Sequence, residues 1–372
     1  MNPLMLPPAP KDVGRLSQVF SSAHASVGGK HSNDLRLKGV RHSIVILIDG
    51  LGYENLTSAK AYARFLNSCH SEVIRTEFPS TTATSITGFA TGTRSDVHGV
   101  IGYSVFDRLA KVGVNLLSGW SSIEDANAFK QAIDISESAG DVRVRVIGPS
   151  IYENSGFTAM TMAAAEYLAA ESIEQRLALA LELPSTPSLT YLYLPELDQL
   201  AHRFGVASQN WLHQLEEVDS LISNFSRAVP GSTGVIVVAD HGVIDVSQEG
   251  QVMLDEYRWY TDAVAYTAGD PRCNFIYLDV DAAIEVLQEQ LIREFGSVAF
   301  VCTIHQLKNS GWADWTKLER TNLVPDLVLI WDSPRVGYDK RFAKPTHLKM
   351  IGQHGGISDA ETRIPLIRFG AY

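Results

Sequence analysis

Runs of apolar residues mark the expected strands along the chain. Residues 44–48 are continuously apolar and mostly β-branched, as in a strand that is covered on both faces. Residues 189–194 and 235–239 have a similar character, and residues 71–76 and 142–147 form weaker strands. The pattern therefore predicts a sheet whose central strands are buried.

Helical segments alternate with these strands. Apolar residues in 209–228 recur close to the i, i+3, i+4, i+7 pattern of an amphipathic helix. Residues 161–183 are rich in Ala, Glu and Leu, and the small-residue segment 82–91 is weakly helical, so we expect a helix in each. Alternating strands and helices predict an α/β fold with a doubly wound, mostly parallel sheet flanked by helices.

Composition shifts divide the chain into three expected parts. The Pro-, Gly- and Ser-containing start carries one short helix near residues 14–27 and could pack on the core or shield an entrance. Later, turn signals interleave with short strands and a helix at 281–295, which indicates a smaller α+β insertion or cap. The predicted boundaries are 1–40 for the arm, 41–255 with 346–372 for the core, and 256–345 for the insertion.

Bulk composition restricts the class of protein. The chain has 372 residues, of which 45% are apolar, enough for a sizeable core. Its formal charge of −11 and the lack of a Lys/Arg-rich stripe argue against a partner that is a nucleic acid polymer. A small anionic substrate fits this charge because bound cations can reverse the local field.

Cysteine usage and the N-terminus bear on location. Cys69, Cys273 and Cys302 are widely spaced and form no C-x-x-C pair, which favours a reducing compartment. The first residues lack a positively charged start and an apolar stretch, and the apolar runs are too short to span a bilayer. We therefore expect a cytoplasmic protein with no membrane partner.

Acidic and histidine residues follow several apolar runs. In a parallel sheet, residues just after the strands share the edge at which ligands bind. Carboxylate oxygen and imidazole nitrogen suit zinc, manganese or iron. Any one such residue reads equally as a helix cap or a solvated side chain, but the whole set predicts a two-metal hydrolase. Its members are Asp49, Asp198 and His202 (an i, i+4 pair), Asp240, His241, and His354, which follows the strand region at 330–331.

The segment 76–92 is dense in hydroxyl side chains. One interpretation is an N-cap followed by a small-residue helix that packs closely on the sheet. The other is a hydroxyl nucleophile at a helix N-terminus that faces a metal, with backbone N–H groups nearby to receive a phosphate anion.

Together these motifs resemble the alkaline phosphatase superfamily, and within it the type I phosphodiesterase/nucleotide pyrophosphatase family. The resemblance covers roughly residues 43–360 in the expected order. It rests on Asp49, the Thr-rich segment running to His98-Gly-Val, Asp198-x-x-x-His202, Asp240-His241-Gly and His354-Gly-Gly. The absence of a Cys-x-(Pro/Ala)-x-Arg element argues against the sulfatase branch.

The resemblance implies a two-metal site, usually zinc, and a covalent intermediate on Thr or Ser. One ion would be held by Asp198, His202 and His354, and the other by Asp49, Asp240, His241 and the nucleophile. Counting back from Gly92 places the nucleophile at Thr82, with Thr81 as the alternative.

The chain departs from the family pattern at Tyr103. Relatives carry an Asn at this slot that binds a non-bridging phosphate oxygen, and a phenol O–H could donate the same bond or line a leaving-group pocket. Arg272 is interpreted either as a second substrate contact or as a surface residue. Trp120 and Phe106 would form an apolar wall or pack in the core.

The expected function is hydrolysis of a small phosphate ester by a phosphodiesterase or nucleotide pyrophosphatase through a phospho-threonine intermediate. A phosphomonoesterase or phosphonate hydrolase on the same site is the close alternative. An alternative of another class is a catalytically silent metal-binding protein that recognises a phosphorylated ligand.

Overall fold

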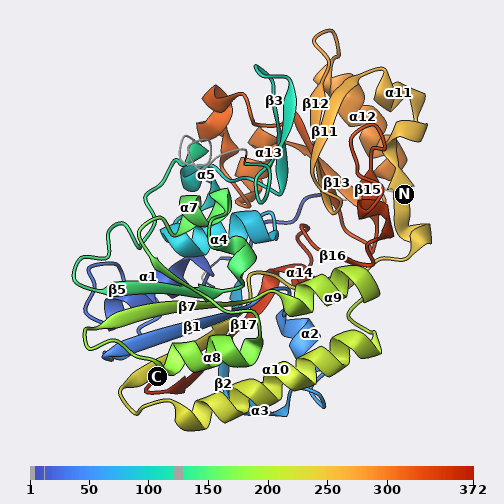
Figure 1. Cartoon of the computed structure of the whole chain (residues 1–372). Helices are drawn as coiled ribbons and strands as arrows, with labels where there is room; N and C mark the ends of the chain where they lie inside the picture. The colour runs from blue at the N-terminus through green and yellow to red at the C-terminus, as the bar shows by residue number, and fades with distance from the viewer. Residues whose placement is uncertain (1–4, 12, 121–128) are drawn as a thin grey trace.

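A computed structural model describes residues 5–11, 13–120 and 129–372. Figure 1 shows a large sheet with helices around it and a second, smaller group of strands beside it. The large sheet has seven strands in the order β2-β17-β8-β1-β7-β5-β6. Their bounds are β1 His42–Ile48, β2 His70–Arg75, β5 Arg143–Gly148, β6 Glu166–Ala169, β7 Ser188–Leu194, β8 Thr233–Val238 and β17 Arg363–Gly370.

The predicted doubly wound, mostly parallel sheet is confirmed. β8, β1, β7, β5 and β6 pair in parallel, whereas β17 runs antiparallel to both β2 and β8. All seven residues of β1 are buried because the strand lies in the middle of the sheet with helices over both faces. In Figure 1, α8 (Ile173–Leu181) is drawn in front of the sheet and α1 (Ser17–Ser26) behind it.

Most expected elements of the core appear close to their predicted bounds. α4 (Thr82–Thr91) is buried along its whole length, and α10 (Gln209–Ala228) buries the apolar face that the periodicity predicts. The other helices of the core are α2 Tyr53–Ser58, α3 Arg64–Ser68, α5 Ser95–His98, α7 Gly156–Thr161, α9 Glu196–Phe204 and α14 Asp359–Thr362.

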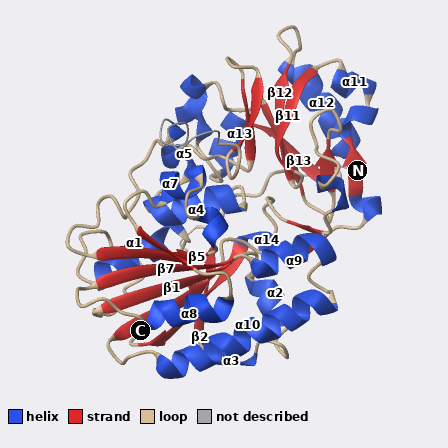
Figure 2. Ribbon diagram, viewed as in Figure 1, coloured by secondary structure: helices blue, strands red, loops and turns tan. Residues whose placement is uncertain are grey.

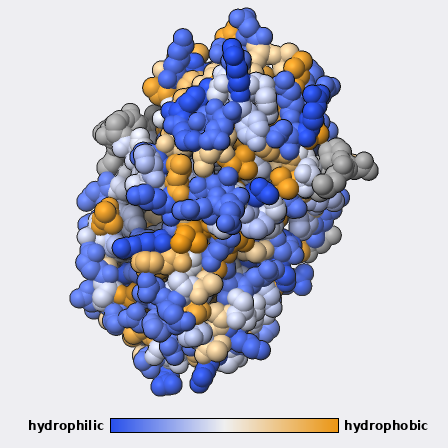
Figure 3. All heavy atoms as spheres, turned by 90° about the vertical axis from the view of Figure 1, so that its right-hand side faces the viewer, coloured by the Kyte–Doolittle hydropathy of each residue, from blue (hydrophilic) through white to orange (hydrophobic). Residues whose placement is uncertain are grey.

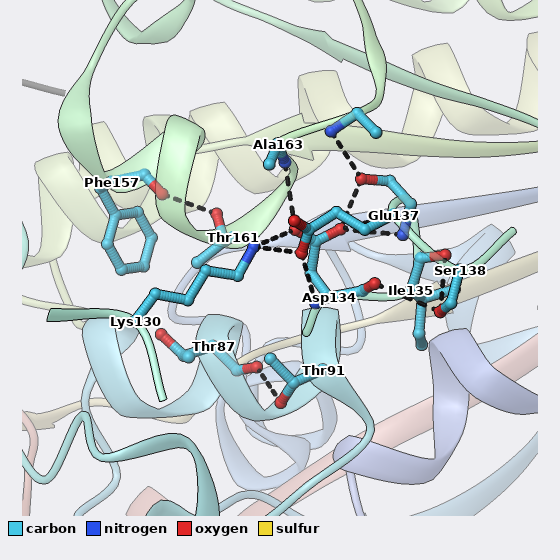
Figure 4. Close-up of polar contacts among 12 residues, drawn as sticks. Thr87, Thr91, Lys130, Asp134, Ile135, Glu137, Ser138, Phe157, Thr161 and Ala163 are labelled. Atoms are coloured by element: carbon cyan, nitrogen blue, oxygen red, sulfur yellow. Dashed lines mark hydrogen bonds and ion pairs between the residues drawn. The ribbon is translucent and has the colours of Figure 1, made fainter. Parts of the chain in front are cut away.

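The predicted single helix over residues 161–183 is wrong. The segment contains the end of α7, the edge strand β6 and then α8, which starts at a capping box formed by Ser172 and Gln175. Asp134 accepts a hydrogen bond from the Ala163 N–H at 3.1 Å (Figure 4), and the Ser136 hydroxyl accepts one from the Ala164 N–H. These tertiary bonds engage N–H groups that a helix would use, so they outweigh the helix propensity of the alanines.

The second group of strands is a four-stranded antiparallel sheet in the order β11-β12-β14-β13 (Figure 2). It has a hydrophobic cluster of its own, which includes Leu291 and Trp331. Its strands and helices are β11 Val264–Asp270, β12 Cys273–Leu278, α12 Ile284–Phe295, β13 Ala299–Thr303, α13 Ile304–Ser310 and β14 Leu327–Trp331. The remaining helix and strands are short: β3 Ser104–Asp107, β4 Val112–Asn115, β9 Ile244–Asp245, β10 Gln251–Met253, α11 Arg258–Thr261, β15 Val336–Tyr338 and β16 Gly352–Gln353.

The N-terminal helix α1 packs on the core. Leu16, Val19, Phe20 and Ala23 have no exposed surface, and the Phe20 ring lies 4.7 Å from that of Phe89 in α4. Of the two roles considered for the N-terminal residues, the structure shows packing for this helix. Polar side chains cover most of the face seen in Figure 3, with small scattered hydrophobic patches. Each helix in the described residues is too short or too polar to cross a bilayer.

Candidate two-metal active site

Three aspartates lie at the carboxyl ends of neighbouring central strands. Asp49 follows β1 directly, Asp240 comes two residues after the end of β8, and Asp198 lies in the first turn of α9 after β7. Because β1 pairs with both β7 and β8 in parallel, these three strand ends meet at one edge of the sheet. The sheet order thus brings together carboxylates that are far apart in the sequence.

Three histidines turn the same ring atom toward these carboxylates. The Nδ1 atoms of His202, His241 and His354 lie 2.8, 3.3 and 3.0 Å from the backbone carbonyls of Gly352, Gly242 and Ser80. A Nδ1–H that donates to a carbonyl leaves Nε2 with its lone pair free, which is the usual orientation of a metal-binding histidine. Each ring is therefore held with Nε2 turned toward the acidic cluster, where this atom could bind a cation.

Facing Nε2 atoms and carboxylate oxygens form two candidate ligand sets. Asp49, Asp240 and His241 make one set and Asp198, His241 and His354 the other, each with ligand atoms within 4.8 Å of one another. His202 Nε2 lies 3.1 Å from Asp198 Oδ2, so it borders the second set. One oxygen of each aspartate is buried without a hydrogen-bond partner: Asp49 Oδ1, Asp198 Oδ1 and Asp240 Oδ2. Such oxygens are costly to bury, and a divalent cation would satisfy them.

The pKa shifts of the aspartates are also consistent with a cation site. Burial and the neighbouring carboxylates raise the pKa of Asp49, and burial with Asp198 nearby raises the pKa of Asp240 to about 7. Burial also raises the pKa of Asp198, but the His202 and His354 rings outweigh it, so the net pKa falls. A bound cation would supply a counter-charge to these neighbouring carboxylates and favour their ionised form.

Burial lowers the pKa of two of the histidines. The pKa of His241 falls to about 4 and that of His354 to about 3, so both imidazoles are neutral at physiological pH. Neutral imidazole is the form that binds a metal. The donor set therefore fits divalent cations such as zinc.

Thr82 reaches this cluster from the start of α4. It is the first residue of the helix, and its Oγ1 lies 3.1 Å from His241 Nε2. Thr81, the alternative nucleophile, is the N-cap residue and lines the same cavity. Of the two hydroxyls, the structure directs that of Thr82 toward the metal-ligand side.

The cluster opens into a cavity of about 280 Å³, which we call the catalytic cavity. Asp49, Asp198, His202, His354 and Thr82 line it, and the lining residues that the structure describes include neither Lys nor Arg. A second cavity of about 430 Å³ adjoins it and shares Thr82, Leu117, Tyr152 and Tyr193. Aromatic and aliphatic side chains dominate its wall, among them Ile86, Trp120, Phe157, Tyr167 and Tyr191.

Tyr103 lies between the catalytic cavity and a third one of about 300 Å³. Its ring packs edge-on against His347, and its hydroxyl lies near the side chain of Asn115, which lines the third cavity. Its backbone N–H donates to Asp270 Oδ2 at 3.3 Å.

Two further residues of the site were missed by sequence reasoning. The hydroxyl of Tyr193 donates to Asp49 Oδ2, and alternation along β7 places Tyr193 one position before the strand ends, where it could have been found. Asp270, at the end of β11, lines the catalytic cavity from the insertion. Its own strand carries no metal-ligand motif that would mark it.

Several subsidiary expectations need correction. Arg272 is neither exposed nor in the cavity, because its buried guanidinium pairs with Glu361 at 3.0 and 2.8 Å. Phe106 stacks on Tyr266 and does not line the aromatic cavity, whereas Trp120 does. The strand at 330–331 belongs to the smaller sheet, and the strand that precedes His354 is the two-residue β16.

Comparisons with known proteins were made for sequence and fold. A search of curated protein sequences found no match. Among solved structures, human ectonucleotide pyrophosphatase/phosphodiesterase 5 matches with a TM-score of 0.67 and 15% identity, over 88% of this chain and 87% of that one. An inactive threonine-to-alanine variant of the murine protein, in complex with AMP, matches with a TM-score of 0.66 and 17% identity, over 88% of each chain.

These structural matches confirm the alkaline phosphatase-like fold. Among protein-family models, that of type I phosphodiesterase / nucleotide pyrophosphatase matches residues 43–291, which span the central strands, Thr82 and five of the six predicted metal ligands. The family consists of metal-dependent hydrolases. The chain belongs to the type I phosphodiesterase / nucleotide pyrophosphatase family.

Proposed function

We propose that this protein hydrolyses small phosphodiesters through a covalent intermediate on Thr82, at a site that holds two divalent metal ions. One observation carries the proposal. Three buried carboxylates with unpaired oxygens, three histidines whose Nε2 atoms face the carboxylates, and the Thr82 hydroxyl converge at one edge of the sheet. The cytoplasmic location stays a prediction from the three free cysteines.

In this proposal Asp49, Asp240, His241 and Thr82 hold one ion, and Asp198, His202 and His354 hold the other. Zinc suits this mixture of oxygen and nitrogen donors, and manganese or iron are alternatives. Bound cations would supply Lewis-acid stabilisation of phosphate oxygens and of the ionised hydroxyl. Support for Thr82 comes from the murine relative, whose threonine-to-alanine variant is described as inactive.

The chain's own residues then account for two displacements at phosphorus. Thr82 Oγ1 forms a bond to phosphorus while the bond to one ester oxygen breaks, and the hydroxyl proton leaves with the departing alcohol. Water next attacks the phospho-threonine, which restores the Thr82 hydroxyl and releases a phosphomonoester. The carbonyls of Gly352, Gly242 and Ser80 hold the three histidines in orientation throughout.

The cavities favour a diester with one apolar substituent. The aromatic second cavity opens beside Thr82 and can accept an aromatic or aliphatic group of the substrate. A phosphomonoesterase or phosphonate hydrolase is the second candidate, because the same ligand set would serve it. The third candidate is a catalytically silent metal-binding protein that recognises a phosphorylated ligand.

Two matched variants test the mechanism. In zinc-loaded protein, Thr82→Ala should lower kcat/KM on bis-p-nitrophenyl phosphate by about 10⁴-fold or more, since a nucleophile is lost. Thr81→Ala, next to it on the cavity wall, should cost far less. Equal losses would remove Thr82 from its role, and a wild-type rate far higher on the monoester than on the diester would favour the second candidate.

A metal count tests the site itself. Elemental analysis should find two ions per chain in the loaded protein. A single ion, or none, would contradict the proposal.

A further inference from the structure

Asp270 places a carboxylate of the insertion in the wall of the catalytic cavity. The residue ends β11 and is 5% exposed. Its backbone carbonyl accepts a hydrogen bond from the Asn274 amide at 3.1 Å, and its Oδ2 accepts the N–H of Tyr103. These bonds from β12 and from the loop before β3 fix the carboxylate between the catalytic and third cavities.

No cation pairs with this carboxylate among the described residues. The catalytic cavity has no Lys or Arg in its described lining, and Lys344, in the wall of the third cavity, forms no ion pair with Asp270. This differs from other buried carboxylates of the insertion and its neighbours, since Asp339 pairs with Arg341 and Glu361 with Arg272. The Asp270 carboxylate therefore lies in the wall of the cavity without an ion-pair partner among the described residues.

Burial and neutral hydrogen-bond donors shift the pKa of the Asp270 carboxyl in opposite directions. Burial raises the pKa of Asp270 to about 7, although the Tyr103 N–H and the Thr81 hydroxyl oppose the rise. Divalent cations at the neighbouring site would favour the ionised form.

A charge count shows the consequence for a substrate. Two divalent cations beside Asp49, Asp198 and Asp240 would leave one net positive charge before Thr82 ionises, and the ionised form of Asp270 would cancel it. A diester brings one negative charge to this neutral site, whereas a monoester near neutral pH brings close to two. The additional charge of the monoester lies on a non-bridging oxygen, and Asp270 lines the cavity that would receive it, where it also accepts the backbone N–H of Tyr103.

We infer that Asp270 is a specificity-determining residue that disfavours dianionic phosphomonoesters and so selects monoanionic diesters. The inference rests on the proposed function, because it presumes phosphate-ester chemistry at this site. It adds a role for the insertion, which contributes this carboxylate to a cavity otherwise lined largely by the core.

The test compares two substrates in matched variants. The ratio of kcat/KM for bis-p-nitrophenyl phosphate to that for p-nitrophenyl phosphate is measured in zinc-loaded wild type, Asp270→Asn and Asp281→Asn. Asp281 is an exposed aspartate of the same insertion outside the catalytic cavity, so this variant carries an equal change of net charge. Asp270→Asn should shift the ratio toward the monoester by about tenfold, as expected for one partly screened charge at close range.

Asp270→Ser provides a second neutral variant if the asparagine variant folds poorly. Both neutral variants should shift the ratio in the same direction, while Asp281→Asn should match wild type. Diester turnover in wild type with a ratio that stays within about twofold in both Asp270 variants would overturn the inference and leave the proposed function standing. Absence of ester hydrolysis by wild type would instead reject the proposed function and the inference with it.

Discussion

Asp134 and Asp240 are both fully buried, yet their carboxylate oxygens have different surroundings. Asp134 Oδ2 accepts bonds from Lys130 Nζ at 2.7 Å and the Ala163 N–H at 3.1 Å (Figure 4). Its Oδ1 accepts the N–H groups of Ser136 and Glu137 and the Ser136 hydroxyl. Every oxygen of this carboxylate is satisfied by the chain itself.

Only one of the two carboxylate oxygens of Asp240 has hydrogen-bond partners. Its Oδ1 accepts the N–H groups of Gly50 and His241 at 3.2 and 3.1 Å, but Oδ2 has no hydrogen-bond partner. Asp49 and Asp198 also have one unpaired oxygen each, and all of these face histidine Nε2 atoms. The difference teaches that burial alone does not distinguish a structural carboxylate from a candidate metal ligand, whereas an unpaired oxygen does.

We expect the largest effect from a substitution among the three aspartates that have an unpaired carboxylate oxygen. Asp240→Asn should lower kcat/KM of zinc-loaded protein by about 10³-fold, because an amide is a poor zinc ligand. The free energy of unfolding of metal-free protein should stay the same or rise at pH 8, since a repelled buried charge is removed. Steady-state kinetics and urea denaturation measure the two quantities. Nearly normal activity would show that Asp240 holds no essential ion.

The next effect is the response to metal. Zinc at about 100 times its Kd should raise the free energy of unfolding of metal-free protein by about 2.7 kcal/mol, because the ion binds only the folded chain. Asp134→Asn should keep this gain, whereas Asp240→Asn should lose most of it. The same gain in both variants would mean that zinc binds elsewhere. Denaturation curves with and without zinc provide the measurement.

We expect a smaller effect, on stability, when Asp134 is replaced, because its oxygens are all hydrogen-bonded within the chain. Asp134→Asn should lower the free energy of unfolding by about 2 kcal/mol, because charge-assisted hydrogen bonds are lost beside Lys130. Activity at a temperature well below unfolding should change by less than about twofold. A loss of activity without a loss of stability would contradict the structural role of this cluster.

The smallest effect is the pH dependence of a second satisfied carboxylate. Burial would raise the pKa of Glu361, but the Arg272 guanidinium and hydrogen bonds from Ser358 and Gly356 outweigh it and lower the pKa below 4.5. The stability that this shift contributes is present above the unfolded pKa and is lost as the pH falls through the lower folded pKa.

Glu361→Gln should therefore flatten the decline in stability below about pH 4.5. Urea denaturation across pH 3 to 7 measures it, with wild type as the reference. An unchanged acid limb would show that other groups account for the decline.

The sequence predicts the parts of the fold in which local pattern and tertiary environment agree. β1, β7 and β8 are short, continuously apolar runs, and α10 has one apolar face, so periodicity identifies each of them. Asp49 and Asp240 are identifiable as site residues because a charge that follows a buried strand is unusual. Parallel pairing then places both at one edge.

Other features depend on contacts that the sequence does not display. β17 lies inside the large sheet although it contains Pro365, a residue that normally argues against an inner strand. The alanines of residues 161–183 favour a helix until Asp134 and Ser136 engage their N–H groups. Asp270 enters the site only because the insertion packs against the core, which no local pattern reports.

The buried pair of Arg272 and Glu361 limits which insertions can be exchanged between this chain and its relatives. Glu361 also accepts the N–H of Gly356, two residues after His354, so one carboxylate anchors both the insertion and the loop that carries His354. Exchanging the insertion for that of a relative would leave Glu361 buried and unpaired unless the donor also carried an arginine at this position. A chimaera between family members therefore has to transfer both partners, or neither, to keep His354 in place.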